Sequence, residues 1–269
     1  MPRLNRAKSA VSDPNHSVFE WSEFDDRTLI GGFQREKQQQ LLVEPLYSSQ
    51  SLELETPFIA ATGVGIFYDQ KQDPLMPDAF LSLGVRTPYY WKQKQHRYYS
   101  VREFGKVPDV CIEIVSNTVG QELTSKKDNY ARIGVPYYAV YDPLRQLQGK
   151  KELDGELLKV WRLTEGKYIA LSEPFCLETV GLGLALWKRK IYEQLVIWLR
   201  WYDEDGYIVH TAAEELQEAR HLLQWERERA DQERSRADQA EDELRQLRAR
   251  LEGRGIDPKD PSKFLDSKN

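Results

Sequence analysis

The segment that decides the fold reads PDVCIEIVS and spans residues 108–116. Within it, residues 110–115 carry five apolar side chains and a single carboxylate, that of Glu113. A nearly continuous apolar run is typical of a strand that is covered on both faces of its sheet. A carboxylate within such a strand is costly to bury unless it binds a cation or accepts good hydrogen bonds. We therefore expect a central strand in which Glu113 has a chemical role.

The sequence on both sides of this segment predicts a mixed α/β domain. Residues 122–133 are expected to form a helix that ends at Gly134, and residues 137–141 the following strand, which together make a strand–helix–strand unit. The spacing of apolar residues and the positions of turn residues predict the other elements. These are, in chain order, a helix over 34–45, strands over 58–68, 79–85 and 98–104, a hairpin over 157–163 and 168–171, a strand over 181–187 and an amphipathic helix over 191–201.

The C-terminal part of the chain has a helical period instead. Thr211 and Glu214 match a capping box, in which each side chain bonds to the other residue's backbone N–H. A seven-residue step predicts a coiled coil that pairs two copies of the chain, weakened in its middle by two glutamates. The alternative is a single solvated helix with charge pairs four residues apart. The two seam positions are Leu216, Leu223, Ala230, Ala237, Leu244 and Leu251, and Ala212, Ala219, Glu226, Glu233, Ala240 and Leu247.

Composition excludes several classes of protein. The 269 residues include only two cysteines and four scattered histidines, which argues against a disulfide framework and a structural zinc site. The sequence has no glycine-rich phosphate loop and no Gly-x-Ser-x-Gly motif. No apolar run approaches the ~20 residues of a membrane helix, and the polar N-terminus has no secretion signal. We expect a cytoplasmic protein without a membrane partner.

Acidic residues are the remaining candidates for chemistry. Asp78 opens one expected strand and Glu113 lies within another. Carboxylate oxygens from neighbouring strands suit Mg²⁺ or Mn²⁺. Two acids, a metal ion and a lysine are the minimum set for hydrolysing a phosphodiester. Asp109 is a poorer partner for Glu113, because four residues of strand separate the two by about 13 Å.

A basic and aromatic segment indicates where nucleic acid could bind, although the net charge of the chain is −5. Cations neutralise phosphates, and aromatic rings stack on bases. A solvated β-hairpin is an equally good interpretation. The cations of this segment, residues 86–106, are Arg86, Lys92, Lys94, Arg97, Arg102 and Lys106.

Several short motifs resemble the Uma-type restriction endonuclease family, which belongs to the PD-(D/E)XK nuclease superfamily. The resemblance rests first on residues 108–116, then on Lys126 with Tyr130, and then on the segments GVPYY at 134–138 and YDP at 141–143. The segments PDAF at 77–80 and WLRWYD at 198–203, and the charged helical tail, are similar as well. Together they cover about residues 30 to 255.

The resemblance implies a restriction-endonuclease-like fold and a role for individual residues. Asp78 and Glu113 would be the two metal-binding acids. The superfamily's usual lysine, two residues after the glutamate, is here Val115. Lys126 on the following helix is the expected replacement, with Lys127 as the alternative. An acid on the first helix sometimes completes such a site, and Glu44 is the candidate.

Two functions follow as hypotheses. The first is an endonuclease that uses Mg²⁺ or Mn²⁺ at Asp78 and Glu113 to hydrolyse phosphodiester bonds, with DNA as its expected partner. The second is a catalytically inactive scaffold that binds nucleic acid or assembles through its coiled coil. In both, the expected organisation is a disordered segment over 1–23, a nuclease domain over 24–208, the coiled-coil helix over 209–253 and a flexible tail over 254–269.

Overall fold

The computed structural model describes residues 32–50, 52, 54, 56–86, 98–116, 121–191 and 194–254, without the side chains of residues 190–195. The chain divides into two compact units, with the boundary between Val209 and His210. The disorder expected over residues 1–23 and the flexible tail expected after residue 254 lie outside the described residues. So do residues 87–97, the middle of the basic and aromatic segment.

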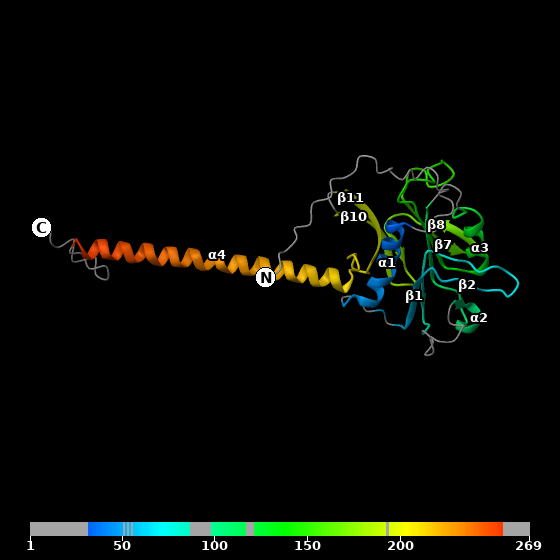
Figure 1. The fold of residues 1–269 in the computed structure, drawn as a ribbon, viewed down its shortest axis with the longest axis horizontal. Coiled ribbons are helices and arrows are strands. Elements are labelled where there is room, and N and C mark those ends of the chain that lie inside the picture. Colours follow the sequence, from blue (N-terminus) through cyan, green and yellow to red (C-terminus); the bar gives the residue numbers. More distant parts are fainter. Residues whose placement is uncertain are drawn as a thin grey trace, which may run out of the picture. The chain divides into compact units, whose positions relative to one another are not determined.

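A six-stranded mixed sheet forms the centre of the first unit (Figure 1). Strands β5 and β6 run parallel, and the other neighbours in this sheet are antiparallel. Helix α3 (Ser125–Ile133) connects the parallel pair, as parallel strands require a crossover. In spatial order the strands are β1 (Phe58–Thr62), β3 (Ala79–Leu83), β5 (Val110–Ile114), β6 (Tyr137–Tyr141), β7 (Leu158–Thr164) and β8 (Lys167–Ala170).

Strand β5 is buried along its whole length, which confirms the expected central strand. Its alternate residues belong to two separate cores, one on each face of the sheet. Ile112 and Ile114 face the core that helix α1 (Phe33–Ser48) covers with residues such as Leu42. Cys111 and Val115 face the opposite core, which includes Tyr130 of α3. Because side chains alternate along a strand, Glu113 lies on the α3 side.

A second sheet contains three antiparallel strands, β9 (Phe175–Leu177), β10 (Leu182–Ile191) and β11 (Gln194–Tyr202). The helix expected over residues 191–201 is therefore wrong. That run is rich in aromatic and β-branched residues, and short apolar runs are ambiguous between helix and strand. Here the continuous pairing with β10, from Gly183 opposite Tyr202 to Ile191 opposite Gln194, decides for a strand.

The strand expected over residues 98–104 is also largely wrong. Only Tyr99–Ser100 form a strand, β4, which pairs with β2 (Ile66–Phe67). The chain then turns into the short helix α2 (Val101–Phe104). The hydroxyl of Ser100 accepts a bond from the backbone N–H of Glu103, and Gly105 ends the turn with φ 74°. These two caps favour a helical turn where a strand was expected.

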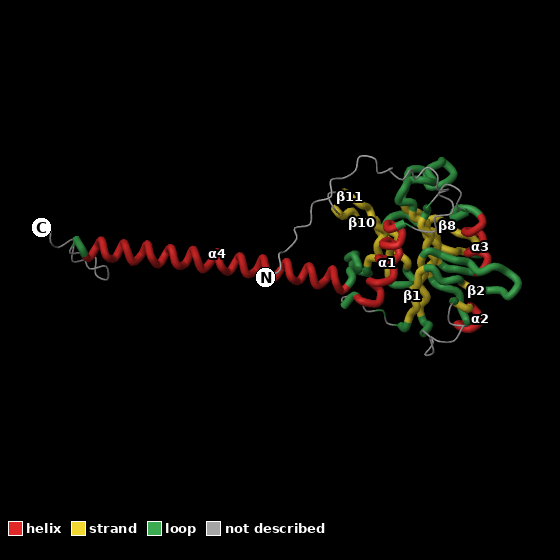
Figure 2. The backbone as a smooth tube through the Cα atoms, in the orientation of Figure 1, coloured by secondary structure: helices red, strands yellow, loops and turns green. Residues whose placement is uncertain are grey.

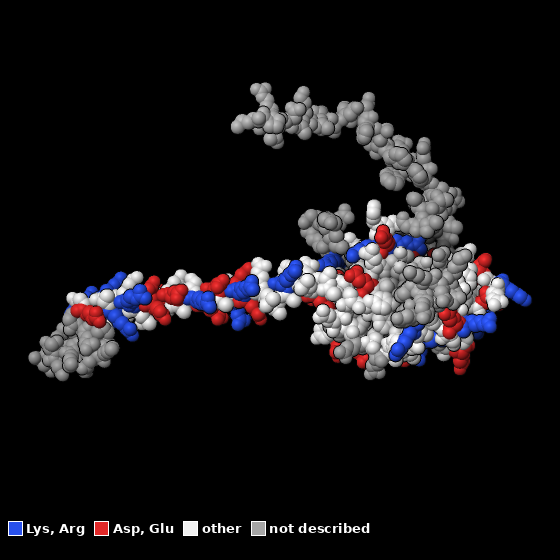
Figure 3. All heavy atoms as spheres, turned by 60° about the horizontal axis from the view of Figure 1, so that its bottom comes forward, with Lys and Arg blue, Asp and Glu red and all other residues white. Residues whose placement is uncertain are grey.

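The second unit contains the helix α4 (Ala212–Glu252), drawn in red in Figure 2. The capping box at its start is confirmed, because Glu214 N donates to Thr211 Oγ1 at 3.2 Å and Thr211 N donates to Glu214 Oε2 at 2.9 Å. Residues 216–250 are all exposed. Positive and negative side chains are interspersed along the helix (Figure 3). None of the helices in the described part of the chain has the length and apolarity needed to cross a membrane.

Candidate active site

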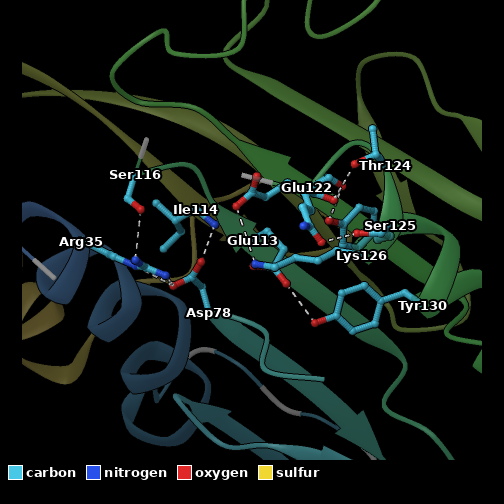
Figure 4. A network of polar contacts seen from close by, with 12 residues as sticks. Arg35, Asp78, Glu113, Ile114, Ser116, Glu122, Thr124, Ser125, Lys126 and Tyr130 are labelled. Carbon is cyan, nitrogen blue, oxygen red and sulfur yellow. Dashed lines mark hydrogen bonds and ion pairs between the residues drawn. The ribbon is translucent and has the colours of Figure 1, made fainter. Parts of the chain in front are cut away.

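The register of two strands brings the expected acids together. Strands β3 and β5 are antiparallel, with Ala79 opposite Ile112. Asp78 precedes Ala79 and Glu113 follows Ile112, so the two acids are neighbours where this pairing ends. Both are almost completely buried, with 3% of Asp78 and 1% of Glu113 exposed. Figure 4 shows both carboxylates within one network of polar contacts.

Asp78 accepts hydrogen bonds on both carboxylate oxygens. Its Oδ1 accepts from Arg35 through Nε at 2.7 Å, forms an ion pair with Arg35 Nη2 at 2.6 Å, and accepts from Gln39 Nε2 at 2.8 Å. Its Oδ2 accepts from the backbone N–H of Ile114 at 2.7 Å. Arg35 also donates through Nη1 to the hydroxyl of Ser116 at 3.3 Å. Helix α1 therefore supplies a cation and an amide to the first acid.

Glu113 has a different set of partners, which come from α3. Its Oε1 accepts from the hydroxyl of Tyr130 at 2.9 Å, and its Oε2 accepts from Lys126 Nζ at 2.8 Å. Burial raises the pKa of Glu113 to about 7, against the opposing effect of Lys126, while the charge of Asp78 raises it further. The carboxyl group of Glu113 is therefore close to its titration point at neutral pH.

Lys126 lies between two acids. Besides the contact with Glu113, its Nζ is 3.6 Å from Oε1 of Glu122. Burial lowers the pKa of Lys126, but Glu113, Glu122 and Asp78 outweigh burial and raise that pKa above its ordinary value. The i,i+4 pair with Glu122 is thus present, yet the shorter contact is the one that crosses from α3 to β5. Glu122 is buried, and its Oε2 has no hydrogen-bond partner among the described residues.

The other candidates lie elsewhere. The Nζ of Lys127 is 4.2 Å from the centre of the Trp161 ring. Asp109 accepts from Leu83 N and from Lys106 Nζ, both at 2.7 Å, at the start of β5 rather than beside Glu113. Glu44 is exposed on α1. The structure therefore brings Asp78, Glu113 and Lys126 together and leaves these three residues out.

The sequence did not indicate Arg35 or Gln39. They are four residues apart and so share a face of α1, but no motif connects them with an aspartate that lies 39 or more residues further along the chain. The one available signal is that both are polar on a helix that must cover a sheet. That signal also fits their neighbour Gln38, whose amide instead bonds to the backbone of Leu199 in β11.

The oxygen atoms of the two acids suit a hard divalent cation, provided that the cation shares them with their hydrogen-bond donors. No group of three or more His, Cys, Asp or Glu that could hold a metal ion occurs in the described part of the chain. Asp78 and Glu113 provide two carboxylates. The backbone N–H of Ile114 points at Asp78, so the carbonyl of Ile114 lies on the same edge of β5. Mg²⁺ accepts such a small oxygen set and keeps several waters. Every carboxylate oxygen already has a donor, so a bound cation must share an oxygen with one of them. The donors to Asp78 are Arg35, Gln39 and the backbone N–H of Ile114, and those to Glu113 are Lys126 and Tyr130.

The first unit is an α/β domain built on a mixed sheet, and the second contains a long C-terminal helix. The sequence matches the Uma2 family, described as "Putative restriction endonuclease", over residues 24–175. The chain belongs to this family, and the resemblance inferred from its motifs is confirmed. Family membership supports a nuclease, a class of hydrolase, and hence a nucleic-acid substrate.

One solved structure is similar, that of "a putative nuclease belonging to DUF820" from Anabaena variabilis ATCC 29413. It is 16% identical to this chain, with a TM-score of 0.37, over 54% of this chain and 71% of that one. The comparison with curated proteins gives no match.

Proposed function

We propose that this protein is a cytoplasmic endonuclease that requires Mg²⁺ or Mn²⁺ and hydrolyses phosphodiester bonds in DNA. The observation that carries the proposal is the buried pair Glu113–Lys126, which lies beside a second buried acid, Asp78. Burying two carboxylates side by side is unfavourable, since each raises the cost of ionising the other. A divalent cation held between them would remove that cost.

Asp78 and Glu113 would hold the metal ion, with the carbonyl of Ile114 as a further ligand. The bound ion supplies Lewis acidity and lowers the pKa of water. Lys126 keeps its proton at neutral pH because the surrounding acids raise its pKa. It therefore acts as a donor and a positive charge that orients the attacking water or a phosphate oxygen, and not as a general base. Tyr130, also on α3, donates its hydroxyl to the other carboxylate oxygen of Glu113.

Calorimetric titration with Mg²⁺ and Mn²⁺ tests this assignment. Binding is expected in the parent protein and is expected to be lost in Glu113→Gln and Asp78→Asn, which keep the shape of each side chain. Glu44→Gln is the matched control, because Glu44 is an exposed acid on α1. Metal-dependent cleavage of DNA should be lost in the same two variants. Absence of binding in the parent, with DNA present, would contradict the proposal and favour the inactive scaffold.

We also propose that α4 pairs two copies of the chain as a coiled coil. Its exposed leucines at the heptad positions support this, among them Leu216, Leu223, Leu244 and Leu247. A dimer would present two sites to the two strands of a duplex. Light scattering on the full chain should show that Leu223→Glu with Leu244→Glu shifts a dimer to a monomer. Leu222→Glu is the control, because Leu222 is equally exposed but lies outside the seam. A parent protein that is already monomeric would refute the pairing.

A further inference from the structure

A pocket of about 260 Å³ adjoins the candidate active site. Its walls come from the start of α1, the end of β5, the turn after β6 and strand β11. It shares Arg35 and Ile114 with the site, since both bond to Asp78. Ser116, which bonds to Arg35, lines it as well. Figure 4 shows Arg35 between Asp78 and Ser116, so a guanidinium group lies between the first acid and a residue that lines the pocket.

The rest of the lining combines aromatic rings and aliphatic side chains with the amides of Gln34, Gln38 and Gln146. Tyr141 and Trp198 provide two aromatic rings, and Pro143 and Leu144 provide apolar surface. The hydroxyl of Tyr141 is already used, because it donates to the carbonyl of Ile197 at 2.6 Å. Such a lining suits a planar, largely apolar group with polar edges.

One polar group in this lining lacks a partner. Trp198 is 5% exposed, and its indole Nε1 has no hydrogen-bond acceptor among the described residues. A buried donor without an acceptor destabilises a protein, and a group bound beside Trp198 would supply the acceptor. The edges of all nucleobases carry such acceptors.

We propose that this pocket binds an unpaired nucleobase of the nucleotide that adjoins the phosphate cleaved at Asp78 and Glu113. The proposal rests on the proposed nuclease function and names its substrate class: single-stranded DNA, or a duplex with a base turned out of its stack. Bases inside a duplex are paired and stacked, and must leave the stack to enter a protein pocket. Arg35 lies between the acids and the pocket, where the sugar–phosphate backbone joins the two parts of one nucleotide.

The test compares DNA with and without bases. Fluorescence anisotropy measures the affinity of the full chain for a fluorescein-labelled single-stranded oligonucleotide, with Ca²⁺ in place of Mg²⁺. Leu144→Ala shortens a lining residue that is 54% exposed, and Trp198→Phe keeps a ring but removes the N–H. Both variants should bind the oligonucleotide about fivefold more weakly, the effect typical of one lost hydrogen bond or one shortened apolar contact. Neither should change the affinity for an oligonucleotide of the same length made of abasic nucleotides.

The control is Ile169→Ala, which removes a similarly exposed side chain, 56% exposed, from β8, outside the pocket. It should bind both oligonucleotides as the parent does. If Trp198→Phe fails to fold, Leu144→Ala decides alone. If the folded variants bind the oligonucleotide as tightly as the parent, the pocket does not bind a base. The proposal of metal-dependent cleavage would not be affected by that result. A duplex that shows the same losses in the variants would support a base turned out of its stack. A parent that neither cleaves nor binds DNA would refute the nuclease and the pocket together.

Discussion

Strand β5 and helix α4 carry charge in opposite ways. In β5 a single carboxylate, Glu113, is buried and has a lysine and a tyrosine hydroxyl within 2.9 Å. In α4 charged residues are numerous and exposed, and pairs such as Arg229–Glu233 lie 3.6 Å apart in solvent. Water stabilises the charges of α4 whatever their partners, whereas in β5 only neighbouring groups can do so. The comparison predicts that substitutions around the one buried carboxylate of β5 change stability and activity more than substitutions at the exposed charges of α4.

The largest expected effect is on the pH dependence of stability. The folded-state pKa of Glu113, about 7, lies above its ordinary value of 4.5, so the folded protein binds this proton more tightly than the unfolded chain. The free energy of unfolding should therefore fall as pH rises from about 4.5 to 7, by up to about 3 kcal/mol. Urea denaturation at pH 5 and pH 7.5 measures this fall. Glu113→Gln should lose most of it, and an unchanged slope would assign the pH dependence to other groups.

An intermediate effect is expected when the partner of Glu113 is removed. Lys126→Met leaves a buried carboxylate without its cation, which should lower the free energy of unfolding by about 1–3 kcal/mol. The same variant should reduce DNA cleavage by roughly 100-fold, as loss of an electrostatic donor does in other enzymes. Lys127→Met is the matched control, because its cation–π contact with Trp161 is worth only about 0.5–1 kcal/mol. Equal losses of stability and of DNA cleavage in the two variants would show that Lys126 contributes no more than Lys127 does.

The smallest effect is expected on α4. Glu233→Gln removes the exposed ion pair with Arg229, and should change the free energy of unfolding by less than about 0.5 kcal/mol. Chemical denaturation at low and high salt measures it. A gain in stability would mean that residue 233 lies in an apolar seam, and so would support pairing of α4 with a second copy.

The same contrast explains what could be predicted from the sequence. Strand β6 has the expected bounds and β5 differs by one residue, because apolar runs bounded by clear turn residues leave little choice. The left-handed Gly134, with φ 90°, ends α3 as expected. Strand β11 was missed because its identity depends on pairing with β10, which is not a local property of the run.

The residues of the candidate site also fall into those that the sequence indicated and those that it did not. An acid in an apolar strand is visible in one sequence, whereas Lys126 was expected from the family resemblance. The structure places Glu113 and Lys126 2.8 Å apart. Arg35 and Gln39 could not be found, because their contact with Asp78 depends on how α1 docks on the sheet. Local patterns therefore indicated the residues with unusual surroundings along the chain, and missed those whose role comes only from tertiary packing.

The pairing of Asp78 with Arg35 has a practical consequence for handling the protein. Both acids are already neutralised by the chain's own cations, Arg35 and Lys126. In zinc fingers the metal supplies much of the folding energy, and chelators unfold them. Here the fold carries its own counter-ions, so treatment with EDTA should empty the site and lower the melting temperature only by the amount that ion binding itself contributes, without unfolding the domain. The apoprotein can then be purified as a folded, inactive form and switched on by adding the ion.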